Sequence, residues 1–294
     1  MRMVGGQQAD IQRATLADTV HRVPVRQRKR LTWSAAEPEK AVRIEQFRIP
    51  AVAIAGALFL SAGAQADPAP RGEPVTGAPE AWAFKLTPSY YVTSGQKDAV
   101  DLNLRGNHGA HALWLANYRR AGEFEQTRIG YEYSAQLGFM QLIPSLQLAS
   151  HGFAGGSLNA QFGSAVYGLL GVARTNLRDY YNLNFDPNDS QVFGIGTRLL
   201  RNSNLTLFTV QDNRLATGQK VIHLVWRYAL ADQQRLSIDL SVKRGRPVAD
   251  AEPVAGNALS LTWDRRDIFF HLARDTKVNF SNDDQTRLSV GLRF

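Results

Sequence analysis

The sequence predicts an all-β fold, a transmembrane antiparallel β-barrel of about 14 strands, with about 12 as the alternative count. Three observations lead to this prediction. Apolar and polar side chains alternate in runs of about ten residues, the length that a tilted strand needs to cross a bilayer. Short and long links alternate between these runs. Aromatic residues gather near the ends of the runs or on their apolar faces.

The N-terminal region lacks this alternation and is expected to lie outside the barrel, which we assign to residues 81–294. Residues 42–66 combine two arginines, an uncharged apolar run and the small-x-small tripeptide Ala64-Gln65-Ala66, which together are typical of a secretory signal peptide. We therefore expect export by the Sec route and cleavage near Ala66. The strongly apolar part, residues 51–60, is much shorter than the roughly 20 residues of a membrane-spanning helix.

Two further segments flank the predicted signal peptide. Residues 1–41 have no sustained apolar period and are interpreted as a non-native or disordered extension, with translation starting near Val42. Residues 67–80 are expected to form a periplasmic segment.

Composition and charge narrow the choice of partners. Most of the net charge of +8 lies in residues 1–66, so the barrel region offers little to attract nucleic acid, and none is expected as a partner. The absence of cysteine excludes disulfides and thiolate chemistry.

The strands are recognised by their period of two. In residues 221–230, His223 and Arg227 lie on the polar face, and the apolar face carries Ile222, Leu224, Trp226, Tyr228 and Leu230. We expect strands at residues 82–93, 99–106, 111–120, 125–136, 140–150, 157–163, 165–174, 191–200, 204–214, 219–230, 235–244, 257–264, 267–277 and 285–294. The lower count applies if residues 157–175 form one bent strand or a bulged pair.

Link lengths and aromatic residues indicate a membrane barrel rather than a soluble sandwich. Tight links at 137–139, 201–204, 231–234 and 265–267 alternate with looser ones, which include 176–190 and 244–256. Short turns at one end and long loops at the other are typical of transmembrane barrels. Interfacial girdles are expected from Trp82, Tyr90, Tyr118, Tyr131, Tyr133, Trp226, Tyr228 and Trp263.

The last predicted strand alternates with particular regularity. Its apolar face is made by Leu288, Val290, Leu292 and Phe294. This strand resembles the C-terminal signature of Gram-negative outer-membrane β-barrel proteins. The resemblance implies a location in the outer membrane, contact with lipid and lipopolysaccharide, and recognition of these four residues by the barrel-assembly machinery. It also implies that the last strand closes the barrel against the first, so that no strand edge stays unpaired.

With the apolar faces toward lipid, the lumen should receive the polar faces. The expected lumenal charged residues are Asp101, Arg105, Arg128, Glu132, Arg198, His223, Arg227, Arg235, Asp239, Lys243, Asp264, His271, Arg287 and Arg293. Basic residues outnumber acidic ones, which indicates a mild preference for anions. Arg227 and Asp239 should pair across neighbouring strands if the turn is centred at residues 232–233. The predicted function is a passive porin-like channel for small polar or anionic solutes.

Two other functions stay open: a barrel-embedded lipid-modifying enzyme (acyl hydrolase or transferase) and a non-conducting structural or adhesion barrel. His223, Ser241 and Asp239 could form a catalytic triad, and Ser150-His151 lies near the predicted outer rim. No nucleophile elbow marks either serine, so no catalytic residue is assigned.

No metal or cofactor is expected. His108 and His111 flank a predicted turn, where such residues are usually only solvated. Asp186, Asn188 and Asp189 could attract a divalent cation but lack the spacing of a calcium loop. That segment is expected to be a polar extracellular loop.

Overall fold

The structure is a computed structural model that describes residues 81–183, 186–231 and 233–294. The predicted extension, signal peptide and periplasmic segment lie outside the described residues. Within the described ranges, no helix is long and apolar enough to cross a membrane.

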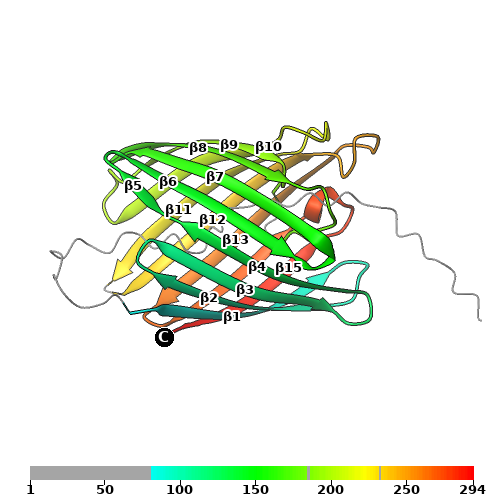
Figure 1. Ribbon diagram of the computed structural model, residues 1–294, viewed down its shortest axis with the longest axis horizontal. Helices are drawn as coiled ribbons and strands as arrows, with labels where there is room; N and C mark the ends of the chain where they lie inside the picture. Colours follow the sequence, from blue (N-terminus) through cyan, green and yellow to red (C-terminus); the bar gives the residue numbers. More distant parts are fainter. Residues whose placement is uncertain (1–80, 184–185, 232) are drawn as a thin grey trace, which may run out of the picture. The chain divides into compact units, whose positions relative to one another are not determined.

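The chain forms one closed antiparallel sheet (Figure 1). Its strands are β1 (Ala83–Thr93), β2 (Ala99–His108), β3 (His111–Arg120), β4 (Phe124–Tyr133), β5 (Ala135–Leu137), β6 (Met140–Ala149), β7 (Phe153–Gly163), β8 (Val166–Thr175), β9 (Ser190–Thr197), β10 (Ser203–Asp212), β11 (Lys220–Ala231), β12 (Gln234–Gly245), β13 (Val254–Arg265), β14 (Ile268–Asp275) and β15 (Gln285–Arg293). The described residues also contain two short 3₁₀ turns, η1 (Ser150–Gly152) and η2 (Val278–Phe280).

The barrel has 14 strands, because β4 and β5 both pair with β6 and are two parts of one strand interrupted at Ser134. The predicted fold class and the higher strand count are therefore confirmed. The segment that allowed a count of 12 is divided into β7 and β8 by the turn at residues 164–165.

Closure occurs between the first and last strands, as predicted. β1 pairs with β15, and the backbone N–H of Phe84 donates to the carbonyl of Phe294 at 2.7 Å. The N–H of Phe294 donates back to the Phe84 carbonyl at 3.0 Å. The Phe84 ring stacks between the rings of Trp82 and Phe294, with centroids 6.0 and 5.8 Å away. This pairing leaves no open sheet edge, which a bilayer would not tolerate.

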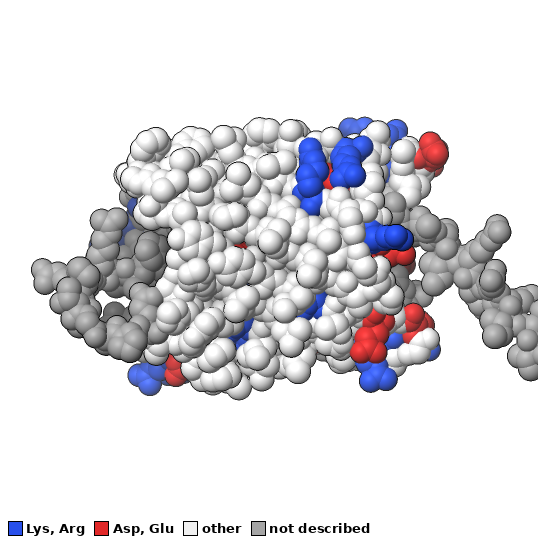
Figure 2. Space-filling view, in the orientation of Figure 1, with Lys and Arg blue, Asp and Glu red and all other residues white. Residues whose placement is uncertain are grey.

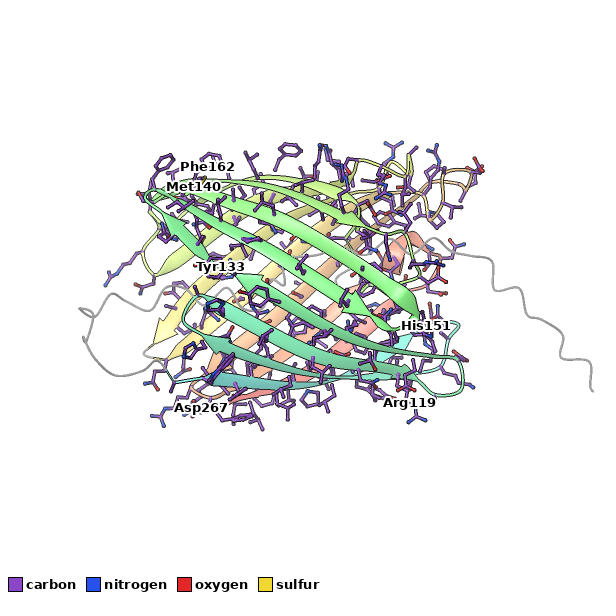
Figure 3. The ribbon with its side chains drawn as sticks, viewed as in Figure 1. Arg119, Tyr133, Met140, His151, Phe162 and Asp267 are labelled. Carbon is purple, nitrogen blue, oxygen red and sulfur yellow. The ribbon has the colours of Figure 1, made fainter. Side chains whose placement is uncertain are left out.

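Link lengths differ between the two ends of the barrel (Figure 1). The short-turn end, where Phe294 lies, holds the links at residues 109–110, 138–139, 164–165, 198–202, 232–233 and 266–267. The long-loop end holds those at residues 94–98, 121–123, 150–152, 176–189, 213–219, 246–253 and 276–284. In Figure 3, Met140, Phe162 and Asp267 mark the short-turn end, and Arg119 and His151 mark the long-loop end.

The outer face of the barrel is apolar. Alternate residues of each strand point outward and stay exposed, as Leu102 at 52% and Leu146 at 64% illustrate. Figure 2 shows a broad uncharged band, with most Lys, Arg, Asp and Glu near the long-loop end. This face suits lipid rather than water, because soluble monomers rarely expose so large a continuous apolar surface.

One predicted girdle residue lies elsewhere. Trp82, Tyr90 and Tyr133 are exposed at the strand ends, but Tyr118 is fully buried inside the barrel. The even-numbered residues of β3 face inward, so the alternation of that strand, rather than closeness to its end, decides where Tyr118 points.

Inward-facing glycines keep two lumenal rings against the wall. Gly130 lies opposite Trp114, and Gly291 lies opposite Phe269. A Cβ atom added to either glycine would collide with the facing ring. The glycines thus let both rings lie flat on the sheet instead of projecting across the lumen.

Candidate functional site

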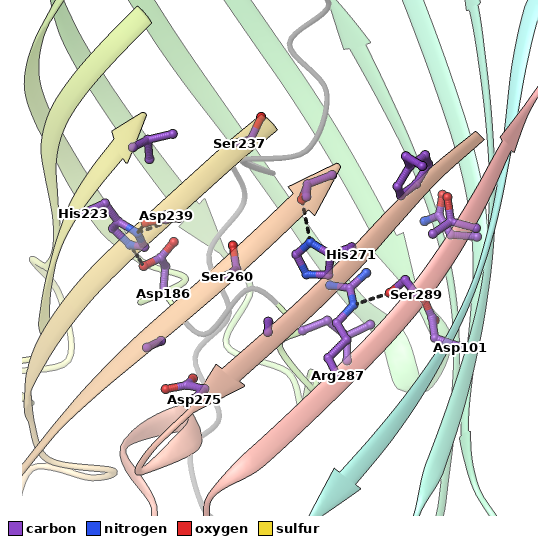
Figure 4. A pocket seen from close by; sticks show the side chains of 18 of the residues that line it. Asp101, Asp186, His223, Ser237, Asp239, Ser260, His271, Asp275, Arg287 and Ser289 are labelled. Carbon is purple, nitrogen blue, oxygen red and sulfur yellow. Dashed lines mark hydrogen bonds and ion pairs between the residues drawn. The ribbon is translucent and has the colours of Figure 1, made fainter. Parts of the chain in front are cut away.

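The barrel encloses a cavity of about 290 Å³. Its wall comes mainly from β1–β4 and β11–β15, and three residues of the 176–189 loop, Tyr180, Leu183 and Asp186, also line it. Figure 4 shows how side chains from β11 to β15 and from β2 converge on this space. The cavity is the candidate functional site because it gathers most of the charged residues that face inward.

Twelve of the fourteen charged residues expected in the lumen line this cavity. They are Asp101, Arg105, Arg128, Glu132, His223, Arg235, Asp239, Lys243, Asp264, His271, Arg287 and Arg293. Arg198 does not, because β9 ends at Thr197 and Arg198 belongs to the turn that follows. There it is exposed, donates to the carbonyl of Ser164 at 2.7 Å and lies 4.4 Å from the centre of the Tyr167 ring.

The predicted cross-strand pair between Arg227 and Asp239 is wrong in its register. Arg227 lies opposite Ser237, and Asp239 lies opposite Val225. The Ala231–Gln234 pair beside the tight turn would by itself place Arg227 opposite Ile238, and a β-bulge between Ala229 and Ala231 shifts the pairing by one more residue, to Ser237. Asp239 instead contacts His223, with its two oxygens 3.1 and 3.2 Å from Nδ1.

The 176–189 loop, expected to be extracellular, folds into the barrel. Tyr180, Tyr181, Asn182, Leu183, Asp186, Asn188 and Asp189 are all buried. Tyr181 stacks on Tyr118 with centroids 4.7 Å apart. Its hydroxyl accepts from Arg120 Nη2 at 3.3 Å and from Gln285 Nε2 at 3.1 Å. These contacts attach one part of the loop to β3 and β15.

A second contact attaches the loop to the opposite wall. Asp186 Oδ1 lies 3.0 Å from Nε2 of His223 on β11, and the carbonyl of Asp186 accepts from Asn182 Nδ2 at 2.6 Å. In a ring of 14 strands, with β4 and β5 counted as one, β3 and β11 lie opposite each other. The described parts of the loop, residues 180–183 and 186–189, therefore contact opposite walls and narrow the lumen.

The lumenal charges near the short-turn end form a ring with a basic excess. Asp264 accepts from Arg235 Nη2 at 3.3 Å and also from Arg293. Arg105 bonds to Glu132, and Lys85 lies level with both Arg293 and Arg105. We call Lys85, Arg105, Arg235, Arg293, Glu132 and Asp264 the short-turn ring. Its four cations face two carboxylates, which favours anions at this level.

Charges nearer the long-loop end are mostly paired. Arg128 bonds to Asp101, and Lys243 bonds to Asp275. His223 stands between Asp239 and Asp186. The inward-facing residues of β6–β9 are uncharged, and hydroxyls there bond to each other, as Ser145 and Ser157 do at 2.9 Å. The lumen thus has one charged wall and one neutral wall.

Neither serine–histidine combination forms a catalytic triad. Ser241 lies opposite His223 on β12, but both ring nitrogens of His223 contact carboxylates, Nδ1 that of Asp239 and Nε2 that of Asp186. Nε2 is therefore not available to accept a proton from the Ser241 hydroxyl, as a triad requires. Ser150 Oγ lies 3.5 Å from Nδ1 of its neighbour His151 at the rim. Within residues 81–183, 186–231 and 233–294, His151 has no carboxylate partner that could orient it.

The residues considered as metal ligands have other partners. Asp189 accepts from Thr175 Oγ1 at 2.6 Å and from Arg214 Nη1 at 2.8 Å. Nδ1 of His111 lies 2.7 Å from the Tyr131 hydroxyl, and the His108 ring stacks on Trp82. No group of three or more ligand side chains in the described ranges could hold a metal ion.

Sequence reasoning missed several lumenal residues, above all Lys85, Tyr180, Tyr181 and Asp275. Lys85 and Asp275 sit near strand ends, where alternation is hardest to read. The loop tyrosines had a detectable signal. Two adjacent tyrosines are unusual in a solvated loop, because their rings are more stable when packed.

No protein-family model and no curated protein sequence matches this chain. Similar solved structures include the KdgM porin, with 9% identity over 71% of this chain and 99% of that one, at a TM-score of 0.42. The Acinetobacter baumannii outer membrane protein Omp33 shows 8% identity over 74% and 100%, at 0.44. A Rhodopseudomonas blastica porin triple mutant shows 7% identity over 73% and 99%, at 0.44. The fold assignment rests on this chain's own closed strand register.

Proposed function

We propose that the protein is a passive channel of the Gram-negative outer membrane that admits small polar solutes and favours anions. The observation that carries this proposal is the charged internal cavity of a closed barrel whose outer face is apolar. Such a barrel is stable in a bilayer, and its polar lumen offers a path that lipid does not. The loop across the lumen restricts that path to small molecules.

The two ends of the barrel support one orientation. Short turns face the periplasm and long loops face the exterior in barrels of this kind. The short-turn ring, with its basic excess, then lies near the periplasmic side. In this proposal, residues 42–66 direct Sec export, cleavage occurs near Ala66, and residues 67–80 stay in the periplasm.

Two outward-facing features fit the expected partners. Lys220 lies opposite Arg244, and both are exposed at the long-loop end, next to apolar Ile222 and Val242. Like charges directly opposite each other are unfavourable unless an anion bridges them. A lipopolysaccharide phosphate would supply that anion. The outward row that the barrel-assembly machinery would recognise, Leu288, Val290, Leu292 and Phe294, is exposed along β15 and just beyond it.

Single-channel recording in planar bilayers tests the channel. The refolded chain should give steady conductance steps, and a KCl gradient should give a reversal potential that indicates anion preference. If circular dichroism shows a folded barrel but the bilayer recordings show no conductance steps, the proposal is refuted and a non-conducting barrel is favoured.

A further inference from the structure

We propose that the lumen contains a binding site for the carboxylate group of a small organic acid, centred on Arg287. The proposal rests on the channel function, since it describes what the lumen would hold during passage. Its residues belong to three adjacent strands, β14, β15 and β1.

Arg287 is a cation held in place by neutral groups. Its Nε donates to Ser289 Oγ at 3.0 Å, and its Nη2 donates to Ser89 Oγ at 3.4 Å. The guanidinium lies 5.4 Å from the centre of the Tyr91 ring. Both serines are buried, and their hydroxyls bond to each other at 2.8 Å. The guanidinium is therefore oriented before any ligand arrives, which lowers the entropy cost of binding.

Arg287 differs in this respect from other cations of the wall. Arg105, Arg128 and Arg293 each bond to a carboxylate. Among the described residues, Arg287 forms no ion pair. Asp101, which lies opposite Ser89 on β2, is bonded to Arg128. Asp101 also attracts Arg287 but forms no ion pair with it, so the Arg287 N–H groups that the serines do not use remain for an anion in the cavity.

A further hydrogen-bonding group lies beside it. His271, opposite Ser289 on β14, has Nδ1 2.8 Å from Thr262 Oγ1, while Nε2 has no partner within the described ranges. Figure 4 shows His271, Arg287 and Ser289 next to one another at the cavity.

The geometry favours a carboxylate over a halide. Nε and Nη2 of Arg287 donate to the two serines, so the edge formed by Nη1 and the second N–H of Nη2 is the planar fork that matches the two oxygens of a carboxylate. Chloride could accept from the fork but could not engage the neighbouring groups as well. A cavity of about 290 Å³ is near the lower limit for ligand pockets, so the ligand is a small acid rather than a polymer.

Isothermal titration calorimetry of the refolded full chain in detergent, with sodium benzoate as the probe, tests the site. Arg287→Gln should weaken benzoate binding at least about tenfold, because it removes a charge-assisted hydrogen bond. Arg287→Lys keeps the charge but loses the fork, and should weaken binding several-fold. Circular dichroism verifies the fold of each variant.

The matched control is Arg293→Gln, which removes one lumenal charge outside the site. It should alter benzoate affinity by less than about twofold, since Asp264 keeps its bond to Arg235. Equal losses in Arg287→Gln and Arg293→Gln would overturn the proposal in favour of a diffuse electrostatic effect. Inorganic phosphate that binds as tightly as benzoate would overturn the assignment to carboxylates.

Calorimetry also separates this proposal from the channel function, because binding does not require conduction. Saturable benzoate binding by a barrel that gives no current would refute the channel and leave the site. Conductance steps without saturable benzoate binding would leave the channel and refute the site.

Discussion

Replacing Tyr181 with alanine should detach the lumenal loop from one wall and widen the channel. The Tyr181 ring stacks on Tyr118, and its hydroxyl accepts hydrogen bonds from Arg120 and Gln285. Alanine can make none of these three interactions. The Gln126 amide, oriented to satisfy both groups, bonds the backbone of residue 181 at 3.2 and 3.3 Å, and these bonds remain possible.

The size of the effect follows from the strength of the three interactions. A hydrogen bond from a charged donor contributes about 1.5–3 kcal/mol and a neutral one about 0.5–1.5 kcal/mol. An aromatic pair adds about 0.5–1.5 kcal/mol. Allowing for new bonds to water, we expect a loss of about 3 kcal/mol in the free energy that holds the loop. This corresponds to roughly a 150-fold shift in the ratio of attached to detached loop.

Single-channel recording would reveal the detached state as a larger conductance step or as frequent transitions to one. Tyr131→Ala is the matched control, because Tyr131 is a tyrosine of the outer face whose hydroxyl contacts His111. It should leave the conductance unchanged. A folded Tyr181→Ala barrel with the conductance and step frequency of the unmodified protein would show that the loop does not limit the channel.

Three further substitutions test other parts of the structure. Gly291→Ala should push the Phe269 ring off the wall, at a cost of about 1–3 kcal/mol, and lower the single-channel conductance; an unchanged value would contradict the packing described. Asp264→Asn removes a carboxylate whose charge changes the energy of an ion about 4 Å away by about 1 kcal/mol in water-like surroundings. The anion-to-cation permeability ratio, from reversal potentials, should rise several-fold, and a fall would refute the role of the short-turn ring. Phe294→Ala loses the stack on Phe84 and should lower the thermal unfolding midpoint by about 2–4 °C for each kcal/mol of stability that is removed; scanning calorimetry that shows no shift would argue against this contact.

Alternation along each strand allowed most of the lumen to be predicted. Asp101 and Leu102 are neighbours, yet one lies inside the barrel and the other faces outward, because successive residues of a strand point to opposite faces. The same rule placed His271 and Arg287 beside the cavity. Two residues were predicted wrongly, one because it lies outside any strand and one because its position in the alternation was not used. Arg198 lies beyond the end of its strand, and Tyr118 was judged by its distance from a strand end.

The sequence by itself thus determined the fold class, a count of 14 or 12 strands and the side that most residues face, because these depend on a local period of two. Only the tertiary structure decided which lumenal groups meet. It places Tyr181 against Gln285 and Asp186 against His223, across long stretches of chain. It also shows that Arg287 donates hydrogen bonds to Ser289 of β15 and Ser89 of β1. These contacts depend on barrel closure, bulge position and loop path, which arise from packing between distant segments and leave no periodic signal in any one of them.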